Sequence, residues 1–121
     1  PEYAPVLVAA RRLARPVKWC DERSDSFLSD QHGRDGWADV SLAFDSEARI
    51  LGAKVISYGN AGAYFSAVGP NMYTNNIQRN FPSVYRLPML YARSHAVFTN
   101  TTPIGAFRGA GRPEAVYFME K

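Results

Sequence analysis

The chain has 121 residues, 46% of them hydrophobic and 21% charged, with a formal net charge of +3. This length is typical of one domain. The single cysteine, Cys20, excludes an internal disulfide and a zinc site built from cysteines. The longest uncharged stretch, Val55 to Gln78, is interrupted by Gly, Asn, Ser and Pro, which excludes a membrane-spanning helix there.

Basic and acidic residues are interleaved along most of the chain, and only residues 11–18 hold a local cluster of Arg and Lys. Nucleic-acid binding normally requires a denser basic patch, so we expect no nucleic-acid partner. No basic segment followed by an apolar stretch resembles a secretory leader. With only one cysteine, a reducing, cytoplasmic setting is the expectation.

The first predicted element is a helix over Glu2–Ala14. Pro5 suits a first helical turn, where its missing N–H group costs nothing. Arginines near the C-terminal end interact favourably with the helix dipole, which accounts for the basic cluster without any ligand. Pro16 ends the helix.

A hairpin is the clearest prediction of the next segment. Val17–Cys20 is β-prone and predicts a short strand, whereas Asp21–Asp35 is polar and predicts a loop or a short helical turn. Apolar residues alternate with other residues over Ala38–Phe44, which predicts a strand with one buried face. The polar turn Asp45–Arg49 then joins it to a second strand, Ile50–Tyr58.

Glycines and prolines divide the rest of the chain. Gly59–Ala63 is predicted to be a small-residue loop. Met72–Phe81 is predicted to be a helix, and Val84–Thr99 a strand that Pro88 interrupts or places at an edge. A loop then leads to a final helix over Pro113–Lys121. This order predicts an α+β fold, with mixed sheet hairpins and flanking helices.

The loop before the last helix carries the strongest chemical signal. Gly109 and Gly111 allow the main chain to approach a ligand closely. N–H groups at the start of a helix favour an anion or an oxo group, and Arg108 and Arg112 add further donors. The spacing matches neither a phosphate loop nor a dinucleotide fingerprint. A glycine-rich turn without a ligand is the alternative.

The segment Ala106–Ala115 closely resembles a signature of the molybdenum hydroxylase large subunits, the family of xanthine dehydrogenase, aldehyde oxidase and carbon monoxide dehydrogenase. Five more segments resemble blocks of this family in the same order along essentially the whole chain. These are Arg15–Trp19, Glu22–Ser24, Asp30–Asp35, Gly62–Tyr64 and Thr99–Pro103.

The resemblance implies that residues 1–121 are part of a molybdopterin-binding domain, a fragment of a subunit several times longer. It implies a molybdenum–molybdopterin cofactor held by backbone loops, and FAD and 2Fe–2S clusters in flavoprotein and iron–sulfur partner subunits. The implied cofactor contacts are Phe107, Arg108, Gly109, Ala110 and Gly111. No direct metal ligand and no catalytic residue is expected within the fragment, because the family's general-base glutamate is not among these residues.

The implied reaction is oxidative hydroxylation of an aldehyde or a heterocycle, a small-molecule substrate, by water. Carbon monoxide dehydrogenases of the family carry a cysteine where this chain has Gly109, so a substrate other than carbon monoxide is expected. Ala110 stands where xanthine and aldehyde enzymes usually have Phe. Asn76 falls where purine oxidisers place a substrate-binding arginine, and it is our candidate substrate-pocket residue.

The isolated fragment would supply one wall of such a pocket, so we expect it to lack the cofactor and activity. The alternative function is a non-enzymatic α+β binding module that uses the Gly109–Arg112 loop. Apolar faces on the Ala38–Phe44 strand and on the last helix predict self-association, through a sheet edge.

Overall fold

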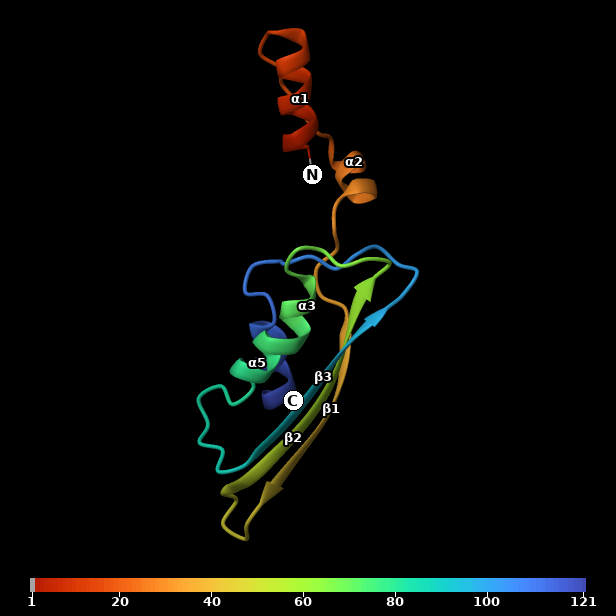
Figure 1. Ribbon diagram of the computed structural model, residues 1–121. Coiled ribbons are helices and arrows are strands. Elements are labelled where there is room, and N and C mark those ends of the chain that lie inside the picture. The colour runs from red at the N-terminus through yellow and green to blue at the C-terminus, as the bar shows by residue number, and fades with distance from the viewer. Residues whose placement is uncertain (1) are drawn as a thin grey trace. The chain divides into compact units, whose positions relative to one another are not determined.

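A computed structural model describes residues 2–121 of the chain (Figure 1). These residues form two compact units, a first that ends at Asp30 and a second, Gln31–Lys121. The second unit contains the sheet and the loop that the sequence singles out.

The first unit consists of two helices, α1 (Tyr3–Leu13) and α2 (Arg23–Ser29). Helix α1 confirms the predicted helix over Glu2–Ala14. The predicted strand Val17–Cys20 is wrong: these residues form no helix or strand, because β-prone residues need a neighbouring strand to pair with. Cys20 is exposed.

The second unit is a three-stranded sheet with helices packed against it, which confirms the predicted α+β class. Its strands are β1 (Gly36–Phe44), β2 (Ile50–Gly62) and β3 (Leu90–Phe98). Strand β2 lies in the middle, antiparallel to β1 and parallel to β3, so the sheet is mixed. The helical segments are α3 (Gly69–Asn71), η1 (Met72–Asn76), α4 (Ile77–Asn80) and α5 (Arg112–Glu120).

These helices cover one face of the sheet (Figure 1). Along β2, alternate residues such as Val55 and Ser57 are buried beneath them, as the period of a half-buried strand requires. Val55 packs in a core cluster with Phe81 of the segment after α4 and Met119 of α5. The helix that the sequence predicts at Met72–Phe81 is present, with one π-helical turn at η1.

The loop predicted at Gly59–Ala63 is wrong, because β2 continues through Gly62. Its small residues serve packing instead of turn formation. A Cβ atom on Gly59 would lie 2.0 Å from Cγ of Tyr73, so only glycine allows the Tyr73 ring to lie against the strand. The ring comes from η1, far along the sequence, and local composition cannot reveal it.

Strand β3 is shorter than predicted. It begins at Leu90, after Pro88, whereas the sequence predicts a strand from Val84. Ser83 has a positive φ of 52°, and residues 81–85 form turns. Because of these turns and Pro88, the strand begins only at Leu90, where the chain pairs with β2.

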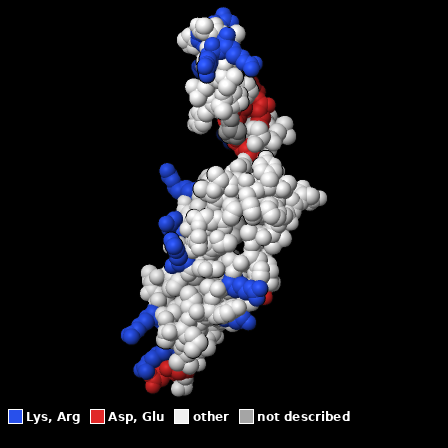
Figure 2. All heavy atoms as spheres, viewed as in Figure 1, with Lys and Arg blue, Asp and Glu red and all other residues white. Residues whose placement is uncertain are grey.

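On the face seen in Figure 2, the Lys and Arg side chains of the second unit lie as separated groups and form no dense basic patch. Within residues 2–121, every helix is too short or too polar to cross a membrane.

The packing of Tyr73 on β2 predicts opposite results for two glycines of the same strand. Gly59→Ala should lower the free energy of unfolding by about 1–3 kcal/mol, because the new methyl group overlaps the Tyr73 ring. Gly52→Ala should cost much less, because its Cβ would meet Met89 at 3.4 Å. Urea unfolding followed by circular dichroism measures both, and equal losses would contradict the constraint.

Candidate functional site

The loop before α5 turns sharply through left-handed backbone conformations. Gly109, Ala110 and Gly111 have φ values of 92°, 20° and 86°. Two backbone hydrogen bonds close the turn, from the Ala110 N–H to the Phe107 carbonyl at 2.8 Å and from the Arg112 N–H to the Gly109 carbonyl at 3.1 Å. Glycine tolerates this geometry at low cost, which explains its place on both sides of Ala110.

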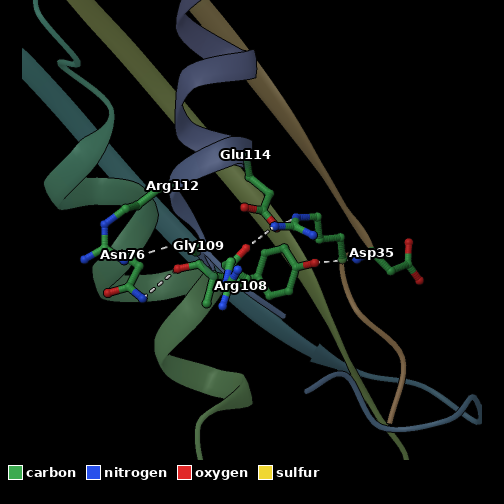
Figure 3. A network of polar contacts seen from close by, with 9 residues as sticks. Asp35, Asn76, Arg108, Gly109, Arg112 and Glu114 are labelled. Carbon is green, nitrogen blue, oxygen red and sulfur yellow. Dashed lines mark hydrogen bonds and ion pairs between the residues drawn. The ribbon is translucent and has the colours of Figure 1, made fainter. Parts of the chain in front are cut away.

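Side chains from distant parts of the second unit bind the carbonyl oxygens of this loop. Nη2 of Arg34, which precedes β1, donates to the Arg108 carbonyl at 2.7 Å. Nδ2 of Asn76, at the end of η1, donates to the Ala110 carbonyl at 2.8 Å. Figure 3 shows Asn76 directed toward the loop from its helix, and the dashed bonds that converge on the loop. These two bonds hold the loop through its carbonyl oxygens, on the side that faces the rest of the second unit.

The N–H groups of the loop are the complementary feature. Within residues 2–121, the N–H groups of Phe107, Arg108, Gly109 and Gly111 donate to no protein acceptor. Consecutive N–H groups in a turn of this kind form a concavity that binds anionic or oxo groups. Phe107 and Arg108 are exposed, so this part of the loop lies at the surface of the second unit, whereas Gly111 is buried against η1.

The two glycines also have a packing role. A Cβ on Gly111 would lie 2.6 Å from both the Met72 carbonyl oxygen and Cβ of Asn76. A Cβ on Gly109 would lie 3.2 Å from the ring of Pro113. The absence of side chains at these two positions thus allows the loop to lie close to η1 and α5. This packing alone would explain a glycine-rich turn, and the N–H groups are the feature that could bind a ligand.

An ion pair between Arg34 and Glu114 lies next to the loop. Nε of Arg34 lies 3.1 Å from Oε1 of Glu114, in the first turn of α5, and the two side chains are 35% and 13% exposed. The Arg34 guanidinium also lies 5.1 Å from the centre of the Phe107 ring. Oε2 of Glu114 is buried and accepts no hydrogen bond from residues 2–121.

Tyr73 connects this site to the sheet. Its phenol oxygen accepts a hydrogen bond from the Asp35 N–H, next to Arg34. Burial raises the pKa of Tyr73, the negative charge of Glu114 raises it further, and the Asp35 hydrogen bond opposes the change. The phenol therefore stays protonated and neutral at physiological pH.

The five predicted cofactor contacts, residues 107–111, lie together in this loop. Asn76, the predicted substrate-pocket residue, is in the same place, and its amide fixes the Ala110 carbonyl. Sequence reasoning did not single out Arg34 and Glu114 as site residues, although both lie in segments that carry the resemblance. Within residues 2–121, no group of three or more His, Cys, Asp or Glu side chains could hold a metal ion.

The full chain, residues 1–121, matches the family described as the molybdopterin cofactor-binding domain. The chain belongs to this family, a domain of the molybdenum hydroxylases. The family expected from the sequence is thereby confirmed.

The relatives are much longer than this chain. It is 40% identical to the 6-hydroxypseudooxynicotine dehydrogenase complex subunit gamma of Paenarthrobacter nicotinovorans, with all of the chain and 15% of the relative aligned. It is 31% identical to the carbon monoxide dehydrogenase large chain of Hydrogenophaga pseudoflava, again over all of the chain and 15% of the relative.

The fold is also that of a solved oxidoreductase. Quinoline 2-oxidoreductase from Pseudomonas putida 86 superposes with a TM-score of 0.76 at 34% identity, over 92% of this chain and 14% of that one. The mixed sheet with its flanking helices is therefore an arrangement that this oxidoreductase shares.

The protonation of Tyr73 predicts a loss of stability at high pH. Its folded pKa lies above the ordinary value of 10.0, so the unfolded chain ionises first as pH rises. The free energy of unfolding should therefore fall above about pH 10, and Tyr73→Phe should reduce that fall. The same variant should lower stability at neutral pH by about 1–3 kcal/mol, because the Asp35 N–H loses its acceptor.

Urea unfolding at a series of pH values measures both effects, with Tyr64→Phe at an exposed position as the matched control. An equal alkaline fall in the wild type and in Tyr73→Phe would contradict the role of Tyr73.

Proposed function

We propose that this chain forms one wall of the cofactor and substrate site in a molybdenum hydroxylase that hydroxylates a ring carbon of an N-heteroaromatic compound with water. The observation that carries the proposal is the loop at residues 107–111. Two of its carbonyl oxygens bind side chains from distant parts of the domain, whereas four of its N–H groups have no acceptor within residues 2–121.

The donor set fits the cofactor of the family. Molybdopterin and its oxo and phosphate groups offer hydrogen-bond acceptors, and the N–H groups of Arg108, Gly109 and Gly111 are donors without acceptors in the described chain. The exposed Arg108 side chain adds positive charge beside them. When bound, the molybdenum–molybdopterin group supplies two-electron oxidation of the substrate carbon and activation of water.

The residues of this chain would hold and orient rather than react. The loop N–H groups would bind the cofactor, while Arg34 and Asn76 keep the loop in its turn. Ala110 contributes only a methyl group, so it leaves room where an aromatic ring would narrow the site. Asn76 supplies no positive charge at the predicted substrate pocket, and its amide nitrogen is already bound to the Ala110 carbonyl, so a neutral heterocycle is favoured over a substrate that needs a fixed cation.

The names of the relatives support an N-heteroaromatic substrate. Besides the 6-hydroxypseudooxynicotine dehydrogenase subunit, they include the nicotine 6-hydroxylase large subunit of the same bacterium, at 27% identity. The compounds in these names, and quinoline in the name of the solved relative, contain a pyridine ring. Gly109 has no side chain, which argues against the cysteine-dependent oxidation of carbon monoxide.

The whole enzyme would be an assembly. The words "complex subunit gamma" and "large chain" in the names of two relatives support a multi-subunit protein. We place FAD and 2Fe–2S clusters in partner subunits, which would remove electrons from the molybdenum centre, and we place the assembly in the cytoplasm.

The holoenzyme that contains this chain tests the function directly. It should contain molybdenum and a pterin by elemental analysis and pterin fluorescence. With a dye as electron acceptor, it should oxidise pyridine and quinoline compounds faster than aldehydes or carbon monoxide. A purified holoenzyme without molybdenum would contradict the function, and faster turnover of aldehydes would contradict the substrate class.

The isolated 121 residues should retain no cofactor and show no turnover in the same assays, because they span 15% of the first two relatives described. A cofactor bound to this fragment alone would contact only one wall of its site and would be exposed to solvent elsewhere. Turnover by the purified fragment would contradict this expectation.

A further inference from the structure

We propose that Arg34 is a positioning residue that sets the direction of the Gly109 N–H group, and thereby prepares the loop for the cofactor. This inference rests on the proposed function. Arg34 makes two contacts with the loop, a hydrogen bond to the Arg108 carbonyl and a contact with the Phe107 ring, and it pairs with Glu114 of the helix that follows.

The geometry of the peptide group gives the first step. The carbonyl of Arg108 and the N–H of Gly109 belong to one planar peptide unit, and the described chain contains no cis peptide bonds. In a trans unit these two groups point in opposite directions. When Arg34 holds the carbonyl toward the domain at 2.7 Å, the Gly109 N–H must point away from it.

The next peptide unit but one repeats the arrangement. Asn76 holds the carbonyl of Ala110 at 2.8 Å, and the same peptide unit contains the N–H of Gly111. The N–H groups of Gly109 and Gly111 are two of the four loop donors without a protein acceptor in residues 2–121. Two side chains from different elements therefore fix the directions of two of these four donors by the same physical means.

Arg34 has a rigid base from which to act. The neighbouring Asp35 donates its N–H to Tyr73, and its carbonyl accepts the Asn60 N–H at 3.0 Å. Nδ2 of Asn60 also donates to Oδ2 of Asp35 at 2.7 Å. Bonds to both η1 and β2 thus hold the backbone at Asp35, beside the residue from which the guanidinium extends.

The contacts require the shape of a guanidinium group. Nη2 and Nε of Arg34 serve two different acceptors, the Arg108 carbonyl and the Glu114 carboxylate, while the flat group faces the Phe107 ring. A lysine ammonium is a compact charge and cannot make these three contacts from one position. Arg34→Lys should therefore preserve the charge beside Glu114 but weaken the control of the loop.

The buried carboxylate of Glu114 offers a way to separate positioning from simple charge balance. Replacing Arg34 alone leaves the Glu114 carboxylate without its cation, and the resulting loss of stability would not by itself distinguish positioning from charge balance. The double variant Arg34→Met/Glu114→Gln removes both charges, so stability should recover. The Arg108 carbonyl still lacks its donor, so the loop should remain disordered.

The experiment uses the holoenzyme with four variants: Arg34→Lys, Arg34→Met, Arg34→Met/Glu114→Gln and, as a surface control, Arg49→Met in the β1–β2 turn. In Arg34→Met and in Arg34→Met/Glu114→Gln, hydrogen exchange of peptides covering residues 106–112 should accelerate by about tenfold, while exchange of β2 stays unchanged. Molybdenum content at limiting cofactor should fall by about tenfold or more in both, and by less in Arg34→Lys. Arg49→Met should match the wild type in both measurements.

Recovery of molybdenum content and loop protection in the double variant would overturn the proposal, because Arg34 would then serve only to neutralise Glu114. Equal acceleration of exchange in β2 and in the loop of the double variant would also overturn it, because the role would be general stability. A wild-type holoenzyme without molybdenum would instead refute the proposed function. The exchange measurement would still decide whether Arg34 orders the loop.

Discussion

The hydrogen bonds that hold the loop carbonyls toward the domain are the interactions on which the site depends. A planar peptide group cannot turn its oxygen inward without turning its N–H outward. The directions of the Gly109 and Gly111 N–H groups are therefore set by the hydrogen bonds that Arg34 and Asn76 donate to the carbonyls of the same peptide units. These two side chains come from the segment before β1 and from η1, so the site exists only when both are packed in place.

That packing depends in turn on Tyr73. Its ring occupies the space that a side chain at Gly59 would need, and its phenol oxygen accepts the Asp35 N–H. A Cβ on Gly36 would also lie 2.7 Å from the same ring. One buried aromatic residue thus couples η1, the central strand and the backbone beside Arg34, which explains why a change in the sheet would reach the loop.

Local patterns predicted the elements whose signals lie within their own sequence, such as the alternating hairpin and helix α1, which has no buried residue. They failed where a distant residue decides. Gly59–Ala63 has the composition of a turn, but pairing with β1 and β3 continues the strand through Gly62, whereas Val17–Cys20 favours a strand and has no partner. The site loop was recognisable from its motif. Its control by Arg34 was not, because 74 positions separate Arg34 from Arg108 and nothing local indicates their contact.

On the proposed function, this arrangement separates two tasks within one loop. The backbone N–H groups bind the cofactor, and side chains behind the loop fix their direction. Side chains at positions 109 and 110 take no part in those bonds, and these are the positions where the resemblance in sequence leads us to expect differences from carbon monoxide and purine enzymes of the family. Because main-chain donors are present whatever the side chain, substrate preference can change at these positions while the cofactor contacts persist, as long as the residue accepts a left-handed backbone.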